Sequence, residues 1–223
     1  MRTSAVALLA LLAAGVAPAP GELRVKASPA VSPCVAAASA AFTSATGRRV
    51  VVETGNVEAV SSAAGADVVV GVEAELTRVI EGGASHPELD VDVARIPWVL
   101  LTPAESPADG LQALGRSTAR LRVLGGTVAR EARRTLGPLP AGEVETMRAS
   151  AGIVRVGRGE AAVVPLSLAG PGHVAPLPVA PLLVRALGVR ASPRPGAARV
   201  FLDFLTSEPG GAAFRACGRA ETR

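Results

Sequence analysis

The sequence predicts an α/β fold with mostly parallel sheets, and two observations carry this prediction. Valine-rich apolar runs of strand length alternate along the chain with segments of about ten residues whose apolar positions recur at helical spacing. The run over residues 66–72 is apolar on both faces, as strands buried in a parallel sheet are. The 223 residues are enough for a substantial core in one or two lobes.

The first residues have the pattern of an export signal. Arg2 precedes an apolar stretch at residues 5–14, which is short for a bilayer span, and small residues follow it. We expect cleavage after Gly21, with residues 13–15 as a second candidate site and an uncleaved anchor as the alternative. Residues 1–21 are therefore predicted to be a signal peptide, and the protein to be periplasmic or extracellular.

A strand, a bend and a helix follow the signal. The strand is expected from Leu23, and the helix is expected to start with Ser32 as its N-cap and Pro33 as its first residue. Gly47 is predicted to end this helix, and a second strand is expected at residues 50–54. A helix start offers unpaired N–H groups and partial positive charge, here with hydroxyls beside them. This unit therefore predicts a binding site for a small anion.

Strands and helices continue to alternate over the rest of the chain. Further strands are expected at residues 66–72, 96–102, 121–124, 161–166 and 182–187. Helices are expected at residues 73–82, 127–136, 144–158, 197–205 and 207–218, the last of them capped by Ser207. Ile80 and Val200 are expected to face the core. The segment 170–181 is rich in proline and glycine and is expected to cross between lobes.

Composition argues against several classes of function. The formal net charge is +4, but the arginines are scattered and the aromatic residues are four Phe and one Trp, so nucleic-acid binding is not expected. His86 and His173 are isolated and lack the spacing of a metal site. No nucleophile motif or pair of carboxylates indicates catalysis. We therefore expect a protein that is not an enzyme and uses neither a cofactor nor a metal.

Two cysteines in an exported protein indicate one disulfide. Cys34 lies in the first turn of the first predicted helix, and Cys217 lies at the end of the last one. Closing so long a loop is expected to stabilise the fold by about 4–5 kcal/mol. The alternative is two separate buried thiols.

Several segments, in order along the chain, are similar to one family. Leu23-Arg-Val-Lys-Ala-Ser-Pro-Ala is similar to its opening strand and serine loop, and Gly65-Ala-Asp-Val-Val-Val to its "GADVVIS" strand. Gly157-Arg-Gly-Glu-Ala is similar to its "ERGEAD" turn, and residues 197–214 to its closing pair of helices. These segments resemble the periplasmic solute-binding proteins of ABC importers, most closely the molybdate-binding type.

The resemblance implies the two-lobed type 2 periplasmic-binding-protein fold. The first lobe would comprise residues 22–100 and 180–223, and the second lobe residues 101–179. The implied function is capture of a small, molybdate-like oxyanion between the lobes and its delivery to an ABC permease in the membrane. We expect the protein to act as a monomer.

The resemblance also implies a ligand site. In the family, serines of the first lobe and backbone and hydroxyl groups of the second surround a tetrahedral oxyanion. In this chain the first serine falls near Ala30, residues 54–56 replace the second serine loop, and an aromatic hydroxyl of the family falls near Ser167. The predicted ligand-binding residues are Lys26, Ser28, Ser32, Thr54, Asn56, Thr127, Ser150 and Ser167. Each hydroxyl or amide could instead cap a helix or form a turn, and Lys26 could be a surface lysine.

Two other functions stay open at this point. A secreted binding or sensor module of the same fold, which docks a protein partner and has lost the family's ligand, would account for the altered serine loops. A secreted hydrolase that uses Ser28 or Ser167 is the third alternative.

Overall fold

The computed structural model describes residues 21–58, 65–117, 120–136, 143–147 and 152–217. The predicted signal peptide, apart from Gly21, lies outside the described residues, and so does Ser150.

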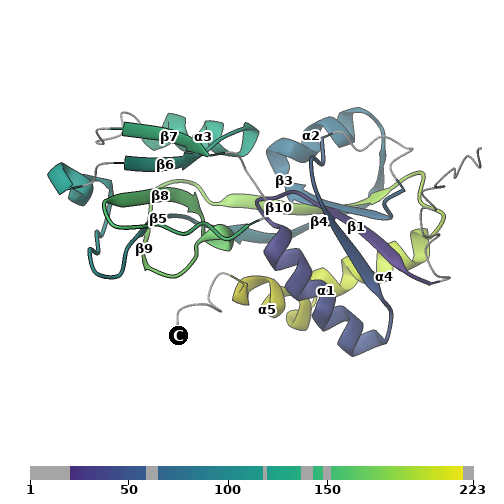
Figure 1. The fold of residues 1–223 in the computed structure, drawn as a ribbon. Coiled ribbons are helices and arrows are strands. Elements are labelled where there is room, and N and C mark those ends of the chain that lie inside the picture. The colour runs from purple at the N-terminus through teal and green to yellow at the C-terminus, as the bar shows by residue number, and fades with distance from the viewer. Residues whose placement is uncertain (1–20, 59–64, 118–119, 137–142, 148–151, 218–223) are drawn as a thin grey trace, which may run out of the picture.

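The structure is built on two five-stranded sheets (Figure 1). The first has the order β2-β1-β3-β10-β4, formed by β1 (Leu23–Ala27), β2 (Val50–Thr54), β3 (Val68–Val72), β4 (Ser85–Ile96) and β10 (Leu182–Val189). The second has the order β7-β6-β8-β5-β9, formed by β5 (Trp98–Thr102), β6 (Arg120–Leu124), β7 (Glu143–Met147), β8 (Glu160–Pro165) and β9 (His173–Pro176).

Strand pairing is evenly mixed rather than mostly parallel. β1 pairs in parallel with β2 and β3, and β6 pairs in parallel with β7 and β8. β10 is antiparallel to β3 and β4, and β5 is antiparallel to β8 and β9. The antiparallel pairs arise because the chain passes from one sheet to the other and returns, so β10 re-enters the first sheet in the opposite direction. Alternation of helices and strands does not reveal such a return.

The chain crosses between the sheets at two places. The first crossing is Pro97, which separates β4 from β5, so the single predicted strand 96–102 is two elements in different sheets. The second crossing is residues 177–181, which join β9 to β10. Proline has no N–H group for a strand ladder, which suits Pro97 to this break. The predicted lobe boundaries stay a prediction, although β5 belongs by its pairing to the second sheet from Trp98 onward.

Helices cover both faces of the first sheet. Figure 1 shows α1 (Ser32–Thr46), α4 (Pro195–Thr206) and α5 (Glu208–Ala216) on one face and α2 (Glu73–Glu81) on the other. The ring of Phe42 in α1 makes edge-on contacts with Phe201 and Phe204 of α4, with ring centroids 5.2 and 5.3 Å apart. In the second lobe, α3 (Thr127–Leu136) follows β6, and the short helices η1 (Leu111–Ser117) and η2 (Leu166–Leu168) connect strands.

A disulfide joins the two ends of the first lobe, as predicted. Cys34, fully buried in the first turn of α1, is bonded to Cys217 at the end of α5, 183 positions later in the sequence. The bond fixes the start of α1 to the last described helix.

Two predicted helix signals are confirmed. Gly47 ends α1 in the left-handed region with a φ of 71°, and its N–H donates to the Thr43 carbonyl at 2.8 Å. Ser207 caps α5 by accepting a hydrogen bond from the N–H of Gly210.

Three local predictions are wrong. The helix predicted over residues 144–158 is absent from the part described there, because Val144 and Thr146 extend as β7 beside β6 and Gly152 begins a bend. Ser32 does not cap α1: Val31 occupies the N-cap position and Ser32 is the first helical residue. Ile80 and Val200 are exposed rather than in the core.

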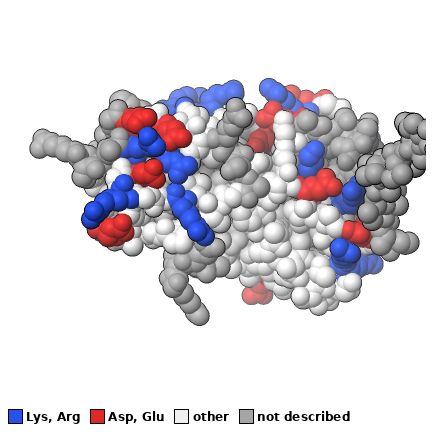
Figure 2. All heavy atoms as spheres, in the orientation of Figure 1, with Lys and Arg blue, Asp and Glu red and all other residues white. Residues whose placement is uncertain are grey.

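Charged side chains of both signs are mixed on the surface. Over β6, β7 and β8, acidic and basic groups intermingle (Figure 2), and Arg120 forms ion pairs there with Glu143, Glu145 and Glu160. Among the described helices, none has the length and apolar character needed to cross a membrane.

Candidate functional site

Four of the predicted ligand residues lie at strand ends and helix starts near the meeting of the two lobes. Ser28 follows β1, Thr54 ends β2, Thr127 begins α3 and Ser167 lies in η2. Because β1, β2 and β3 are parallel and paired in register, their carboxyl ends reach the same edge of the sheet. This edge is where open α/β sheets bind ligands.

Ser32 and Thr54 come together, but they bond to each other. Their hydroxyl oxygens are 2.5 Å apart, so the start of α1 is linked to the end of β2. The carbonyl of Ser28 accepts hydrogen bonds from the N–H groups of Val31 and Ser32, at 3.1 and 3.0 Å, and this tight turn leads directly into α1. Ser32 and Thr54 therefore stabilise the loop in which Ser28 lies.

Ser28 has a buried hydroxyl group without a hydrogen-bond partner. Its side chain is 0% exposed, and its oxygen makes no hydrogen bond within the described structure. The backbone N–H of Ser28 donates to the Val70 carbonyl of β3 at 2.9 Å, which fixes the position of the residue. An unsatisfied buried hydroxyl is unusual in folded proteins and is a reason to look for a ligand.

The neighbour of this hydroxyl is the carboxyl group of Glu75, in the first turn of α2. Burial raises the pKa of Glu75, and the charge of Glu58 raises it further. Ser28 and the N–H of Val72 oppose this rise by favouring the charged form. Glu75 Oε2 accepts the Val72 N–H at 3.3 Å, whereas the Ser28 hydroxyl is close to the carboxyl without meeting hydrogen-bond geometry.

A glycine makes room for the Glu75 carboxyl. A Cβ atom at Gly71 would lie 3.4 Å from Glu75 Oε2 and 3.1 Å from a methyl group of Val57. The carboxyl therefore lies against the backbone of β3, between the Ser28 loop and the first turn of α2.

Two hydrogen bonds join the lobes beside this cluster. The Thr127 hydroxyl of α3 donates to Glu58 Oε1 at 3.0 Å. Glu58 Oε2 is held within the first lobe by Arg78 of α2, which donates to it at 2.9 Å. The Ser167 hydroxyl donates to the Ala30 carbonyl at 2.6 Å in a buried contact. Two predicted ligand residues of the second lobe thus contact the first lobe itself.

The other predicted residues take no part in this cluster. Asn56 is exposed, and its side-chain oxygen accepts the N–H of Glu58 at 2.9 Å, which is a turn interaction. Lys26 is half-buried beside Gly55 and, within the described residues, forms no ion pair or hydrogen bond through its amine.

Cavities lie between the N-terminal ends of α2 and α3. One of about 310 Å³ and one of about 240 Å³ are both lined by Ala74 and Thr127. The smaller one also contacts Trp98 and residues 180–183, next to the two crossings. Val72, the N-cap residue of α2, offers no side-chain acceptor to the first-turn N–H groups. Two helix starts therefore face a shared space between the lobes.

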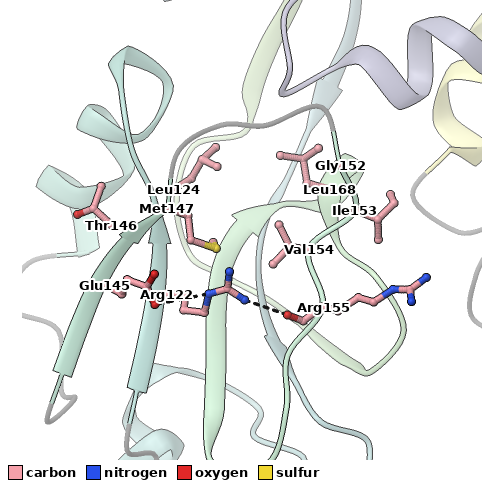
Figure 3. A pocket seen from close by; sticks show the side chains of 10 residues that line it. All are labelled: Arg122, Leu124, Glu145, Thr146, Met147, Gly152, Ile153, Val154, Arg155 and Leu168. Atoms are coloured by element: carbon pink, nitrogen blue, oxygen red, sulfur yellow. Dashed lines mark hydrogen bonds and ion pairs between the residues drawn. The ribbon is translucent and has the colours of Figure 1, made fainter.

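A larger cavity, of about 410 Å³, lies within the second lobe (Figure 3). Arg122 extends across it, donates to the Arg155 carbonyl at 3.0 Å and pairs with Glu145. None of the described residues that line it is a predicted ligand residue. The guanidinium group of Arg122 is thus already bonded to groups of the protein itself.

Glu58 and Glu75, which lie beside the predicted ligand residues, were not predicted from the sequence. Glu75 lies two positions after the start of a correctly predicted helix, and Glu58 follows the predicted turn at residues 54–56. A first-turn glutamate is an ordinary helix-start signal, so only the position of its carboxyl against β3 at Gly71, beside Ser28, marks it as part of a site. No group of three or more described His, Cys, Asp or Glu residues forms a potential metal site.

Replacement of Glu75 by glutamine is expected to raise the free energy of unfolding, relative to that of the wild type, more at alkaline pH than at acidic pH. Because the pKa of Glu75 is raised by burial, the folded protein binds the proton more tightly than the unfolded chain. The wild-type free energy of unfolding therefore falls as pH rises from the unfolded pKa through the folded pKa, and the glutamine variant lacks this fall.

Urea unfolding of both proteins at about pH 4 and about pH 8 measures the difference. Glu81→Gln, an exposed position on the same helix, is the matched control and should show no such pH dependence. An equal effect of Glu75→Gln at both pH values would contradict the raised pKa.

The comparisons with known proteins agree with this architecture. Residues 23–219 match the family model of bacterial extracellular solute-binding proteins, and the chain belongs to that family. No curated protein sequence matches the chain significantly.

Solved structures share the fold at low sequence identity. The Azotobacter vinelandii periplasmic molybdate-binding protein superposes with a TM-score of 0.66 and 15% identity, covering 88% of this chain and 97% of its own. A Clostridium difficile protein described as the substrate-binding domain of a molybdenum ABC transporter gives a TM-score of 0.65 and 17% identity, with the same coverage. Iron-bound HitA from Pseudomonas aeruginosa gives 0.61 and 15%, covering 88% of this chain and 84% of its own. The predicted resemblance and the two-lobed α/β fold are confirmed.

Proposed function

We propose that this solute-binding protein captures a small oxyanion between its two lobes and delivers it to the permease of an ABC importer. The observation that carries the proposal is the buried hydroxyl of Ser28, which has no hydrogen-bond partner among the described residues, at the carboxyl edge of the first sheet. The protein acts outside the cytoplasm after export through the signal at residues 1–21, and it binds its solute as a monomer without chemical change.

Neutral donors at the space between the lobes support an anionic ligand. The first turns of α2 and α3 both face the space between the lobes, and helix N-termini favour negative charge. Thr127 adds a hydroxyl from the second lobe. Donors fixed by the fold can replace the hydration shell of an oxyanion when the cleft closes.

A solute that binds between the lobes must replace the hydrogen bonds that join the two lobes directly. In this structure, Ser167 and Thr127 are bonded to Ala30 and Glu58 of the first lobe. We expect the lobes to separate at the two crossings, so that a solute can enter and then exchange hydrogen bonds with these groups. The two structural neighbours described by molybdate or molybdenum support an oxyanion as the solute class, while the iron-bound neighbour shows that the fold accepts other solutes.

Ser28→Ala is expected to weaken oxyanion binding about 10- to 100-fold with little loss of stability. A hydrogen bond to a charged group contributes about 1.5–3 kcal/mol, and here the variant removes that donor. Stability should hardly change, because the hydroxyl makes no hydrogen bond to any residue that the structure describes.

Isothermal titration with phosphate, sulfate and molybdate measures affinity, and thermal melting measures stability. Ser44→Ala is the matched control, because Ser44 is exposed on α1 and bonds to the Ala40 carbonyl within the helix. Equal affinity in wild type and Ser28→Ala would show that the solute binds elsewhere.

A second candidate function rests on the same cross-lobe bonds. Glu75 faces Ser28, and Ser167 and Thr127 bond to the opposite lobe, so the cleft could be closed on its own side chains. The protein would then be a secreted binding or sensor module that docks a protein partner. Native mass spectrometry of protein purified from its own periplasm distinguishes the two: a retained small anion supports solute capture, and a retained protein with an empty cleft supports docking.

A further inference from the structure

The described space between the lobes is larger than a tetrahedral oxyanion. The cavities of about 310 Å³ and about 240 Å³ share Ala74 and Thr127 as lining residues, so they lie side by side between α2 and α3. Figure 1 shows these two helices next to each other where the lobes meet. A tetrahedral oxyanion takes up the space of about three water molecules, or about 90 Å³. Each cavity therefore has room for a molecule larger than phosphate, sulfate or molybdate.

The smaller cavity has an apolar wall. Val72 of the first lobe and Trp98 and Val128 of the second line it, and each of these side chains is 4% exposed or less, so the fold itself fixes the shape of the wall. Residues 180–183 complete the lining beside the second crossing. A bare oxyanion gains nothing from such a wall, because its oxygens need hydrogen-bond donors on every side. A mainly apolar lining with few polar groups is typical of sites for small organic molecules.

The two cavities differ in the charge of their lining. Arg130 and Arg134 of α3 line the larger one. Arg130 is exposed, and its guanidinium group makes no hydrogen bond or ion pair with a residue that the structure describes. Glu73 lines the smaller cavity and pairs with Arg185 at 3.6 Å. An anionic group is therefore favoured beside Arg130 and disfavoured beside Glu73.

We infer that the solute is an organic anion, whose carboxylate or phosphate group binds beside Arg130 and whose apolar carbon skeleton lies in the smaller cavity against Trp98 and Val128. A volume of about 240 Å³ has room for a skeleton of about four to eight carbon atoms. Thr127, which lines both cavities, contributes a hydroxyl where head group and skeleton meet. The inference deepens the proposed function and rests on it in that the solute binds between the lobes, with the oxyanion as the head group of a larger molecule.

The carbon skeleton sets the expected selectivity. Burial of one methylene group in an apolar site raises affinity about fourfold. We therefore expect wild type to bind butyl phosphate at least about tenfold more tightly than inorganic phosphate, with partial burial of the chain taken into account. Ethyl phosphate should have an intermediate affinity. Because the head group is the same in all three anions, the rise with chain length reports on the apolar cavity alone.

The first experiment is isothermal titration of the full mature protein with the sodium salts of phosphate, ethyl phosphate, butyl phosphate, sulfate and molybdate. Ala74→Leu fills the space that the two cavities share with a side chain that a helix accepts readily. We expect it to lower the affinity for butyl phosphate at least about tenfold and to abolish the rise with chain length. Ala37→Leu is the matched control, because Ala37 is exposed on α1 and lines neither cavity.

A second variant tests the place of the head group. Arg130→Gln removes the guanidinium group and is expected to weaken binding of each phosphate about 10- to 100-fold, because a hydrogen bond to a charged group is lost. The rise of affinity with chain length should persist in this variant. Arg199→Gln removes an exposed positive charge from α4 instead and should bind as wild type does.

The outcomes distinguish this inference from the function on which it rests. Affinity that rises with chain length in wild type and no longer does so in Ala74→Leu supports the inference. Inorganic phosphate, sulfate or molybdate bound as tightly as butyl phosphate, or butyl phosphate bound equally by wild type and Ala74→Leu, overturns the organic solute and leaves oxyanion capture in place. Unchanged affinity in Arg130→Gln overturns the position of the head group. Binding of none of the five anions overturns both proposals. Circular dichroism and melting of each variant show that a change in affinity comes from folded protein.

Discussion

Removal of the disulfide by Cys34→Ala and Cys217→Ala together is expected to destabilise the protein by about 4–5 kcal/mol. The bond closes a loop spanning 183 positions, so its loss gives the unfolded chain much more conformational freedom. Single domains have total stabilities of about 5–15 kcal/mol, so a loss of this size removes a large share. Urea unfolding of wild type and the double variant, followed by far-ultraviolet circular dichroism, measures the difference.

A chemical control comes from the wild-type protein itself. A thiol reductant should lower the midpoint of the wild type toward that of the double variant without changing any side chain, and it should leave the double variant unaffected. A double variant as stable as oxidised wild type would show that the unfolded chain gains no freedom when the bond is lost, contrary to the loop-entropy argument.

The disulfide also bears on the candidate site. It anchors the first turn of α1, and the turn that enters this helix contains Ser28, Ala30 and Ser32. Without the bond, this end of the helix would be held by its contacts with α5 and by the hydrogen bonds of Ser32 to Thr54 and of Ala30 to Ser167. We therefore expect the loop that presents the Ser28 hydroxyl to lose order before the sheets do when the protein is reduced.

The sequence predicted the local elements well where the signal lies within a few residues. Gly47 ends its helix as expected, because the left-handed conformation there favours glycine. The helix at residues 127–136 has the predicted bounds, since a strand and a Gly-Gly turn precede it. The helix predicted at residues 144–158 failed because pairing with β6, which lies some twenty residues earlier, decides the conformation of β7.

The candidate site was predicted as a set of residue types but not as an arrangement. Ser28 is among the predicted residues, and its hydroxyl has no hydrogen-bond partner within the described structure, whereas Ser32, Thr127 and Ser167 bond to groups of the protein that are distant in sequence. Such partners depend on how helices pack on sheets and how the two lobes meet, and local patterns in one sequence do not reveal that packing. Glu75 was missed for the same reason.

The second large effect is expected at Asp67, at the other end of the first lobe: Asp67→Ala should destabilise the protein by about 3–5 kcal/mol. Asp67 is 1% exposed, and its carboxylate accepts hydrogen bonds from the Arg24 N–H at 2.8 Å, the Ser192 hydroxyl at 2.6 Å and Arg194 at 3.0 Å. These partners come from β1 and from the loop after β10, so one side chain joins the first and last strands of the lobe to β3.

The size of the effect follows from what the substitution leaves behind. Arg194 would keep its hydrogen bond to the Glu22 carbonyl at 2.6 Å but lose its counter-charge, and the Ser192 hydroxyl and the Arg24 N–H would lose their acceptor.

Urea unfolding of Asp67→Ala against Asp203→Ala, an exposed aspartate on α4, separates this loss from that of an ordinary surface charge. A double variant with Arg194→Met should lose less than the sum of the two single changes, because the unpaired cation is then removed as well. Additive losses would mean that Asp67 and Arg194 do not stabilise each other, and that the acceptor role of Asp67 toward Arg24 and Ser192 alone holds the strands together.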